Sequence, residues 1–290
     1  MNDFQPVLER GCTAADLDAT GARLLRLGSN AVYRLKIPVI ARISRPGTDV
    51  APVRRSVAVA RWLELVNYPA VRALSVDQPF MVDGYVITFW QSISADGEQF
   101  ATTSQLADIL AQLHHLTVPE HLQLHELDPF AESVHRLNTS TWLAREDRTF
   151  FTATLTRLRA AYTALEFELP PGPIHGDASV GNVLRDTHNN PVLIDLDGFA
   201  TGPREWDLVL TAMYYDRYGW HTRQEYEEFA RVYGYDIMRW PGYQTLADIR
   251  EFLMVTWMVQ KAEDPQFAAE ATKRITALRT GASRKDWQPA

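Results

Sequence analysis

The sequence has a single cysteine, Cys12, among its 290 residues. An internal disulfide framework is therefore excluded, and this cysteine content is typical of proteins in a reducing compartment. The residues around Cys12 do not form a pattern that indicates nucleophilic or redox chemistry. We interpret Cys12 as a small, inert side chain.

Long hydrophobic runs are also missing. No stretch approaches the ~18–20 apolar residues needed to span a bilayer, and residues 1–11 lack the basic-then-apolar order of a signal peptide. Neither a basic stripe nor a zinc-ligand spacing is present, which disfavours nucleic acid as a partner. We expect a cytoplasmic protein without a membrane or nucleic-acid partner, and the oligomeric state stays open.

The composition is that of an ordinary globular protein, with 46% apolar and 22% charged residues. The net charge of −7 is unevenly distributed, because residues 1–91 carry 11 Lys and Arg against 8 Asp and Glu, whereas the remainder carries 18 against 28. A mildly basic first part suits a polyanionic ligand such as ATP, and an acidic second part suits a cationic partner. Ordinary solvated surface explains the same asymmetry equally well.

The first part of the chain has the pattern of strands with one helix. Turn-forming residues Gly28-Ser29-Asn30 separate two short strand-like runs, and Asp83-Gly84 is a strong hairpin signal. Expected strands cover residues 22–27, 31–35, 39–44, 81–82 and 85–90, and residues 53–66 have helical spacing.

Helical patterns dominate after residue 91. They cover residues 104–116, 131–144, 149–165, 206–218, 223–232, 245–259 and 265–278, and one strand-rich island lies at 173–200 with a strand at 191–196. The simplest arrangement is an α+β protein with a small antiparallel β-sheet lobe at residues 1–91 and a larger, mainly helical lobe at residues 92–290. A hinge near residues 89–91 would join the two lobes.

The strand-rich island contains a pattern that suits phosphoryl transfer. It includes the run from His175-Gly176-Asp177 to Asn182, followed by Ile194-Asp195-Leu196-Asp197. Phosphoryl transfer needs a carboxylate that orients the attacking hydroxyl and accepts its proton, and oxygen ligands that hold magnesium against the phosphates. Asp177 can supply the first function, while Asn182 and Asp195 form a hard-oxygen site suited to Mg²⁺.

These residues resemble the aminoglycoside phosphotransferase and choline kinase-like family, which are relatives of protein kinases. The similarity extends to Leu110–His114 and to the segment Gly202-Pro203 through Asp207-Leu208. The resemblance implies a two-lobed protein-kinase-like fold with ATP and Mg²⁺ as cofactors. Asp177 is then the catalytic base, and Asn182 and Asp195 are the magnesium ligands.

The resemblance also implies the position of the nucleotide. Gly28, Ser29 and Asn30 lie where the family covers the phosphates, and the segment Phe89, Trp90 and Gln91 lies where its hinge receives adenine. Alone, this glycine turn is only a hairpin, because it lacks a full Gly-x-Gly-x-x-Gly pattern.

Arg42 stands where protein kinases usually have a phosphate-contacting lysine. An arginine can grip phosphate oxygens with two donors, so the function can survive this replacement. Such kinases pair that cation with a helical glutamate, but the expected helix has Ser56 there, which cannot neutralise Arg42. The alternative is that Arg42 is an exposed cation on a strand.

Three further residues have a structural and a chemical interpretation. His175 could be a base, and we favour a buried histidine that shapes the loop. Asp197 could bind metal, and we favour a bracing role in which it accepts backbone N–H bonds. Asp207 lies near the start of a helix, where a carboxylate is stabilising, and we interpret it as structural.

The sequence contains few signals that identify the acceptor site. Tyr215, Asp216 and Trp220 combine aromatic faces with a carboxylate, which suits a sugar, nucleoside or amine. Helical core packing explains these aromatic residues equally well. We expect a small-molecule acceptor that carries a hydroxyl group. A cationic group on the acceptor would be attracted by the negative charge of the second part of the chain.

Three functions fit these observations. The first is an ATP- and Mg²⁺-dependent phosphotransferase that acts on a hydroxyl of an aminoglycoside or other antibiotic. The second is a metabolic kinase for an amino alcohol, a sugar or a choline-like acceptor. The third is a nucleotide-binding protein with weak catalysis, which Arg42 and the missing helical glutamate suggest. A helical interaction scaffold, which would show no magnesium-dependent binding of ATP, is a further alternative.

Overall fold

The computed structural model describes residues 4–94 and 99–288, and the chain divides into two compact units. Unit 1 consists of Met1–Leu124 and Val180–Phe199, and unit 2 consists of His125–Ser179 and Ala200–Ala290. The predicted lobe boundary at residue 91 stays a prediction, because the two compact units do not by themselves identify a hinge.

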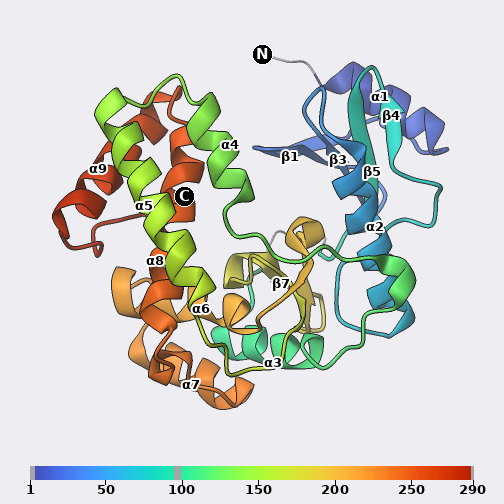
Figure 1. The fold of residues 1–290 in the computed structure, drawn as a ribbon. Coiled ribbons are helices and arrows are strands. Elements are labelled where there is room, and N and C mark those ends of the chain that lie inside the picture. Colours follow the sequence, from blue (N-terminus) through green and yellow to red (C-terminus); the bar gives the residue numbers. More distant parts are fainter. Residues whose placement is uncertain (1–3, 95–98, 289–290) are drawn as a thin grey trace. The chain divides into compact units, whose positions relative to one another are not determined.

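Unit 1 is built around a five-stranded antiparallel sheet with the strand order β1-β2-β3-β5-β4 (Figure 1). The turn at Asp83-Gly84 joins β4 and β5, as the hairpin signal predicted. The strands are β1 (Arg23–Leu27), β2 (Ala31–Arg34), β3 (Val39–Ile43), β4 (Phe80–Val82) and β5 (Tyr85–Gln91).

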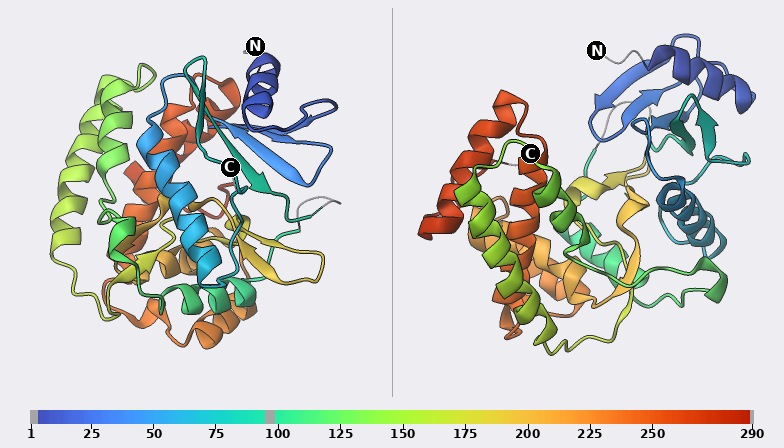
Figure 2. Two further views of the ribbon diagram at one scale, coloured as in Figure 1. Left: turned by 90° about the vertical axis from the view of Figure 1, so that its right-hand side faces the viewer. Right: turned by 45° about the horizontal axis from the view of Figure 1, so that its top comes forward.

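One face of this sheet is covered by the helix α1 (Gln5–Ala14), which lies against β4 and β5 (Figure 2). The sequence pattern did not predict this helix. Its buried side includes Leu8 and Cys12, which pack with Ala41 and Phe89 of the sheet. Because strand side chains alternate between faces, the next residues along each strand point away from this core.

The rest of unit 1 consists of helices and one further hairpin. The helix α2 (Val50–Leu65) begins at Asp49, whose carboxylate caps the amide of Ala51 at 3.0 Å. A two-stranded antiparallel sheet pairs β7 with β8. The remaining elements are α3 (Thr103–Leu113), η1 (Glu120–Leu122), η2 (Val180–Asn182), β7 (Val183–Arg185), β8 (Pro191–Leu193) and η3 (Leu196–Gly198).

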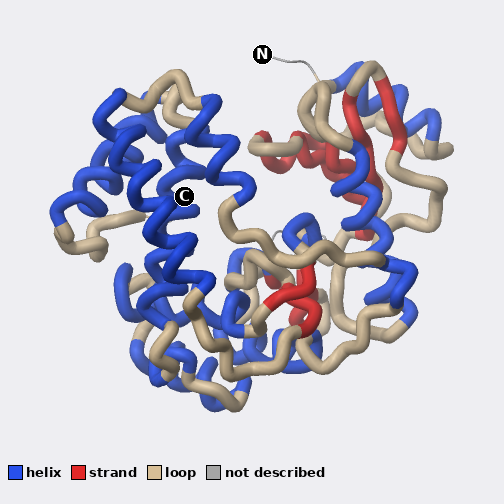
Figure 3. The backbone as a smooth tube through the Cα atoms, viewed as in Figure 1, coloured by secondary structure: helices blue, strands red, loops and turns tan. Residues whose placement is uncertain are grey.

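Unit 2 is mainly helical, with one short antiparallel pair of strands (Figure 3). Its central helix is α8, which is buried around most of its circumference and packs against α4, α5, α6 and α9. The elements are α4 (Ala131–Thr139), α5 (Arg145–Thr163), β6 (Gly172–Ile174), β9 (Ala200–Gly202), α6 (Glu205–Met213), η4 (Tyr214–Tyr218), α7 (Arg223–Tyr233), η5 (Ile237–Arg239), α8 (Tyr243–Gln260) and α9 (Pro265–Thr280).

Several predicted elements end earlier in the structure than expected, and the helix expected at residues 131–144 ends at Thr139. The helix expected at residues 206–218 changes at Tyr214 into the π-helix η4, a wider turn that is frequent at functional sites. The strand expected at residues 191–196 ends at Leu193, because Asp195 has a left-handed backbone with φ of 57°. None of the helices in the described part of the chain combines the length and apolar character that crossing a membrane requires.

Candidate active site

A pocket in unit 1 lies on the face of the sheet opposite the α1 core. Strand alternation creates it: Ala31, Tyr33 and Ala41 face the core, whereas Val32 and Arg42 face the other way and are directly paired. The neighbouring pair, Arg34 and Ile40, lies on the same face, and Trp90 of β5 pairs with Ile40. The sheet therefore contributes one wall in which apolar and cationic side chains alternate.

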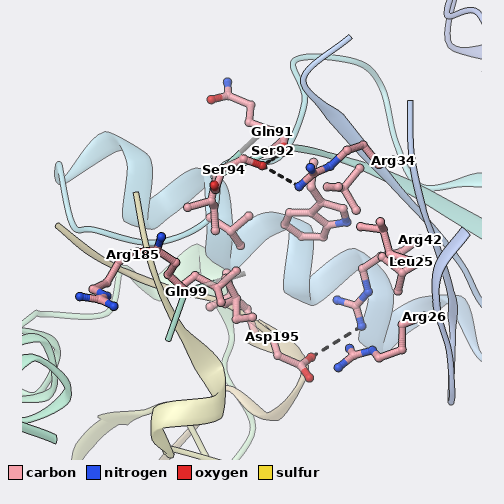
Figure 4. Close-up of a pocket in the computed structure, with 18 residues that line it drawn as sticks. Leu25, Arg26, Arg34, Arg42, Gln91, Ser92, Ser94, Gln99, Arg185 and Asp195 are labelled. Atoms are coloured by element: carbon pink, nitrogen blue, oxygen red, sulfur yellow. Dashed lines mark hydrogen bonds and ion pairs between the residues drawn. The ribbon is translucent and has the colours of Figure 1, made fainter. Parts of the chain in front are cut away.

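The pocket has a cavity volume of about 120 Å³, which becomes about 860 Å³ when the space that is open to solvent is included. Figure 4 shows Arg34 and Arg42 reaching into it from the sheet, with Asp195 on the opposite wall. The lining residues combine an apolar surface, suited to a flat ring, with four cations: Arg26, Arg34, Arg42 and Arg185. Such a lining is complementary to a nucleotide.

The predicted adenine-binding segment divides between this pocket and the core. Trp90 and Gln91 line the pocket, whereas Phe89 is fully buried on the other face, where it packs against Phe80. The physical reason is the two-residue period of β5, which turns Phe89 away from Trp90. The chain after Gln91 also lines the pocket, and the carbonyl of Ser94 accepts a hydrogen bond of 2.6 Å from Arg34.

The predicted phosphate-covering turn joins β1 to β2. The amide of Gly28 donates to the carbonyl of Asn30 at 3.0 Å, and Arg45 donates to the carbonyl of Gly28 at 3.1 Å. Gly28, Ser29 and Asn30 are not among the lining residues of the pocket. Their contact with phosphate stays a prediction.

Arg42 is held by acidic residues that are distant in the sequence. Its guanidinium lies 2.6 Å from Oδ2 of Asp197 and 3.6 Å from Oδ1 of Asp195. Burial by itself would lower the pKa of Arg42, but the two carboxylates raise it above its ordinary value. Arg42 is therefore a fixed cation in the pocket, and the alternative of an exposed strand cation does not describe its surroundings.

Ser56 of α2 completes this arrangement. Its hydroxyl lies 2.8 Å from Oδ1 of Asp197, so Asp197 accepts hydrogen bonds from a serine on one oxygen and from Arg42 on the other. Partial burial alone would raise the pKa of Asp197, but the charge of Arg42 and these hydrogen bonds lower it. Asp197 thus provides the acid that the sequence of α2 lacks, instead of accepting the backbone N–H bonds that we favoured.

The two predicted metal ligands flank the small hairpin of unit 1. The ladder pairs Val183 with Leu193, and just beyond it the amide of Ile194 donates to the carbonyl of Asn182 at 2.9 Å. Asn182 and Asp195 therefore lie next to each other in space, at the same end of the hairpin. The left-handed backbone of Asp195 is uncommon for a residue other than glycine, and such positions concentrate at functional sites.

This donor set fits a hard divalent cation whose ligands come partly from the protein and partly from a nucleotide. In the part of the chain that the structure describes, no cluster of three or more His, Cys, Asp or Glu could hold a metal alone. Mg²⁺ does not need such a cluster, since it commonly binds one or two carboxylates together with substrate phosphates and water. Asp195 and Asn182 are the residues that would hold it.

In unit 2, Asp207 fixes the loop that contains Asp177. The carboxylate of Asp207 is fully buried and accepts the amide of His175 at 2.7 Å and the amide of Gly176 at 2.9 Å. His175 is also fully buried, and its Nδ1 accepts the amide of Asp177 at 3.3 Å. His175 and Asp207 therefore shape the loop, and Gly176 adopts the positive φ of 85° that its sharp turn requires.

Asp177 itself is exposed on this rigid loop. Its side chain is 63% exposed, and Oδ1 accepts a hydrogen bond of 2.7 Å from Arg250 of α8. Arg250 lies over the ring of Trp206 at 4.8 Å and is itself almost completely buried. Sequence reasoning missed Arg250, because a single arginine within an apolar helical pattern carries no local signal of its partner.

The predicted acceptor residues have partners of their own. Tyr215 stacks on Tyr226 at 5.4 Å, Asp216 accepts a hydrogen bond of 3.1 Å from Tyr243, and the indole of Trp220 donates to the carbonyl of Trp287 at 2.9 Å. These contacts are those of packed side chains.

Tyr214, which the sequence did not single out, lies close to Asp177. Burial first, and then the negative charge of Asp177, raise the pKa of Tyr214 to about 12. The π-helix η4 begins at Tyr214, and the Tyr214 ring contacts Trp220 at 4.8 Å. Tyr214 is therefore within the electrostatic influence of Asp177 and in ring contact with Trp220, one of the predicted acceptor residues.

Other residues that line the unit 1 pocket were also missed. Arg26, Arg34, Arg185, Ser92 and Ser94 line it, and none belongs to the predicted site. Strand alternation could have indicated Arg34, because it lies two residues after Val32 on the face away from the core. Arg185 comes from the distant hairpin, and only the fold brings it there.

Comparisons with known proteins are consistent with this geometry. A model of the phosphotransferase enzyme family, APH, matches residues 22–249. A comparison with curated proteins finds no match.

Many solved structures are similar to the chain, including the following three. The chain resembles an amicoumacin kinase in complex with AMP-PNP, Ca²⁺ and Ami, with a TM-score of 0.75, 13% identity and coverage of 99% of this chain and 96% of that one. For a spectinomycin phosphotransferase in complex with ADP, the TM-score is 0.64 and the identity is 16%, with coverage of 94% of this chain and 93% of that one. For a choline/ethanolamine kinase family protein from Mesorhizobium loti, the TM-score is 0.63 and the identity is 19%, with coverage of 95% of this chain and 92% of that one.

At these identities, the similarities establish the fold. They confirm the predicted α+β, protein-kinase-like fold with its small antiparallel sheet and its larger helical part. The family match covers most of the chain and confirms the predicted enzyme class, a phosphotransferase with an alcohol group as acceptor. The chain belongs to the phosphotransferase enzyme family.

Proposed function

We propose that this protein uses ATP and Mg²⁺ to phosphorylate a hydroxyl group of a small molecule, with Asp177 as the catalytic base. The observation that carries the proposal is the state of Asp177: an exposed carboxylate on a loop whose backbone is fixed by the buried Asp207. A general base must be reachable by its substrate and held in one position. Asp177 meets both conditions.

The chemistry is an in-line displacement. The acceptor oxygen forms a bond to the γ-phosphorus while the bond between this phosphorus and the β–γ bridging oxygen breaks, and ADP leaves with that electron pair. Asp177 receives the proton of the hydroxyl. Mg²⁺, held by Asn182 and Asp195, would supply charge neutralisation of the phosphates.

Unit 1 supplies the residues suited to the nucleotide. The apolar wall around Trp90 fits the base, and Arg42 fits the phosphates. The amicoumacin kinase of similar fold was solved with AMP-PNP and Ca²⁺, which supports a nucleotide with a divalent cation. The third alternative, weak catalysis, was suggested by Arg42 and the missing helical glutamate. The ion pair of Asp197 with Arg42 argues against it, because Asp197 supplies an acid in place of that glutamate.

An antibiotic is the leading acceptor, because two proteins of similar fold are a spectinomycin phosphotransferase and an amicoumacin kinase. A metabolic acceptor is the second candidate, and the contact of Arg250 with Asp177 favours it. Arg250 places a positive charge beside the base, so a sugar or another acceptor that is neutral near its reacting hydroxyl is better accommodated than a polycation.

The test combines nucleotide binding with phosphate transfer. Asp177→Asn should lower turnover at least about 100-fold while AMP-PNP affinity changes less than about threefold, because a base acts in the transition state and not on the bound nucleotide. Asp77→Asn, a change of an exposed aspartate outside the motif, is the matched control. Acceptors should include aminoglycosides, peptide and nucleoside antibiotics, choline, amino alcohols and sugars. Unchanged turnover of Asp177→Asn contradicts the proposal.

A further inference from the structure

Arg250 is a buried cation in the interior of unit 2. It lies on α8, and only 8% of its side chain is exposed. A buried charge without a partner is strongly destabilising, so the contacts of such a residue indicate what it is retained for. In the part of the chain that the structure describes, Arg250 forms hydrogen bonds with Gly176 and Asp177 of this loop and lies over the ring of Trp206, which supports the loop.

The backbone of Gly176 is held through both its amide and its carbonyl. Its carbonyl accepts a hydrogen bond of 3.1 Å from Arg250 and one of 2.9 Å from the indole of Trp206, while its amide donates to Asp207 at 2.9 Å. Trp206 also provides the aromatic face on which Arg250 lies. The guanidinium of Arg250, which extends from α8, is therefore held by Trp206 of α6 and by the carbonyl of Gly176.

From this position Arg250 contacts Oδ1 of Asp177 at 2.7 Å. The two partners differ sharply in exposure, since the side chain of Asp177 is 63% exposed and that of Arg250 only 8%. An exposed aspartate normally samples several rotamers, but a fixed donor on the interior side restricts the direction of the carboxylate. The contact thus orients the carboxylate without closing it to solvent.

We propose that Arg250 is a positioning residue for the reaction, which orients the carboxylate of Asp177 toward the acceptor hydroxyl. The proposal rests on the proposed function of Asp177 as a base. A misplaced base loses rate steeply, because a hydroxyl is activated only within hydrogen-bond reach of the carboxylate. Arg250 acts through Asp177, so its effect should disappear when Asp177 is no longer a base.

The first experiment measures kcat, the KM for ATP and AMP-PNP affinity for Arg250→Gln. We expect kcat to fall about 10- to 100-fold, with AMP-PNP affinity within about twofold of the wild type. Arg250→Lys keeps the buried charge but cannot contact Gly176 and Asp177 together with the fork of a guanidinium. We expect it to fold and to lose kcat to a smaller extent, which keeps the test valid if Arg250→Gln does not fold.

A matched control is available in Arg274. It is also a buried arginine, it lies 4.8 Å over Trp287, and it pairs with Glu270 at 2.8 Å. Arg274→Gln therefore removes the same kind of interaction elsewhere in unit 2. We expect it to lower the unfolding temperature as Arg250→Gln does, while kcat stays within about threefold of the wild type.

The second experiment is a double-mutant cycle with Asp177→Asn. If Arg250 acts only through Asp177, adding Arg250→Gln to Asp177→Asn should reduce the residual kcat by less than about twofold. Independent, multiplying losses would overturn the proposal, and so would a kcat for Arg250→Gln within twofold of the wild type. Absence of phosphate transfer by the wild type, or full turnover by Asp177→Asn, would instead overturn the proposed function and this inference with it.

Discussion

The chain of contacts from Ser56 through Asp197 to Arg42 gives a prediction whose size can be worked out. Ser56 is almost fully buried and lies 2.8 Å from one oxygen of Asp197, and Arg42 lies 2.6 Å from the other. A hydrogen bond to a charged group contributes about 1.5–3 kcal/mol. The side chain of Asp197 is 49% exposed, so water compensates for part of the loss, and we expect Ser56→Ala to destabilise the protein by about 1 kcal/mol.

The assay is a double-mutant cycle in urea unfolding at pH 7, with Ser56→Ala, Asp197→Ala and the double variant. Because Ser56 and Asp197 contact each other, the coupling energy should be about 0.5–1 kcal/mol. The control is Ser133→Ala, a buried serine of unit 2 that lies 3.2 Å from the hydroxyl of Thr256. Its effect should add to that of Asp197→Ala within about 0.5 kcal/mol.

The same cycle has a defined pH dependence. Burial opposes the shift, but Arg42 and the two hydrogen bonds lower the pKa of Asp197 in the folded state. A carboxyl group with a lowered folded pKa stabilises the protein fully above its unfolded value of about 3.9 and loses this contribution as the pH falls through the folded value. The coupling should therefore be constant between pH 7 and 5 and should shrink in stronger acid. Strict additivity at pH 7, or a coupling that grows in acid, would refute this reasoning.

Two further predictions concern stability and reactivity. Burial, and to a smaller degree the charge of Asp18, raise the pKa of Cys12 to about 11, so iodoacetamide at pH 8 should alkylate Cys12 only after unfolding, and mass spectrometry of the native protein should find it unmodified. Gly242→Ala should lower the unfolding free energy by about 1–3 kcal/mol, because the added Cβ would lie 2.3 Å from the ring of Trp240. In urea unfolding, Gly28→Ala is its control, since that Cβ meets no atom within 4 Å; equal stability of the two variants would contradict the steric argument.

Much of the fold could be predicted because its signals are local. The hairpin at Asp83-Gly84 and the helical spacing of residues 245–259 both depend on neighbouring residues, and the structure contains β4–β5 and α8 at these places. The helix α1 was missed, because a short helix at a chain end with mixed polarity has a weak pattern; its stability comes from packing on the sheet.

The site shows the same division. Asp177, Asn182 and Asp195 could be singled out from their residue types, their spacing and the family resemblance, and their roles stay predictions. Phe89 was grouped with Trp90 because a range of residues was assigned to the hinge, and the alternation of β5 separates the two side chains. The π-helix η4 places Tyr214 near Asp177, and a pattern with a period of 3.6 residues cannot anticipate such a widened turn.

The sequence by itself determined most of the order of strands and helices, apart from α1 and the π-helix η4, together with the enzyme class and the residue types that phosphoryl transfer needs. Only the tertiary structure decided which residues support them. Asp197 lies 155 positions from Arg42, and Arg250 lies 73 positions from Asp177. Neither pair leaves a periodic signal, because contacts between distant segments depend on how the helices and strands pack and not on the residues that surround each partner in the chain.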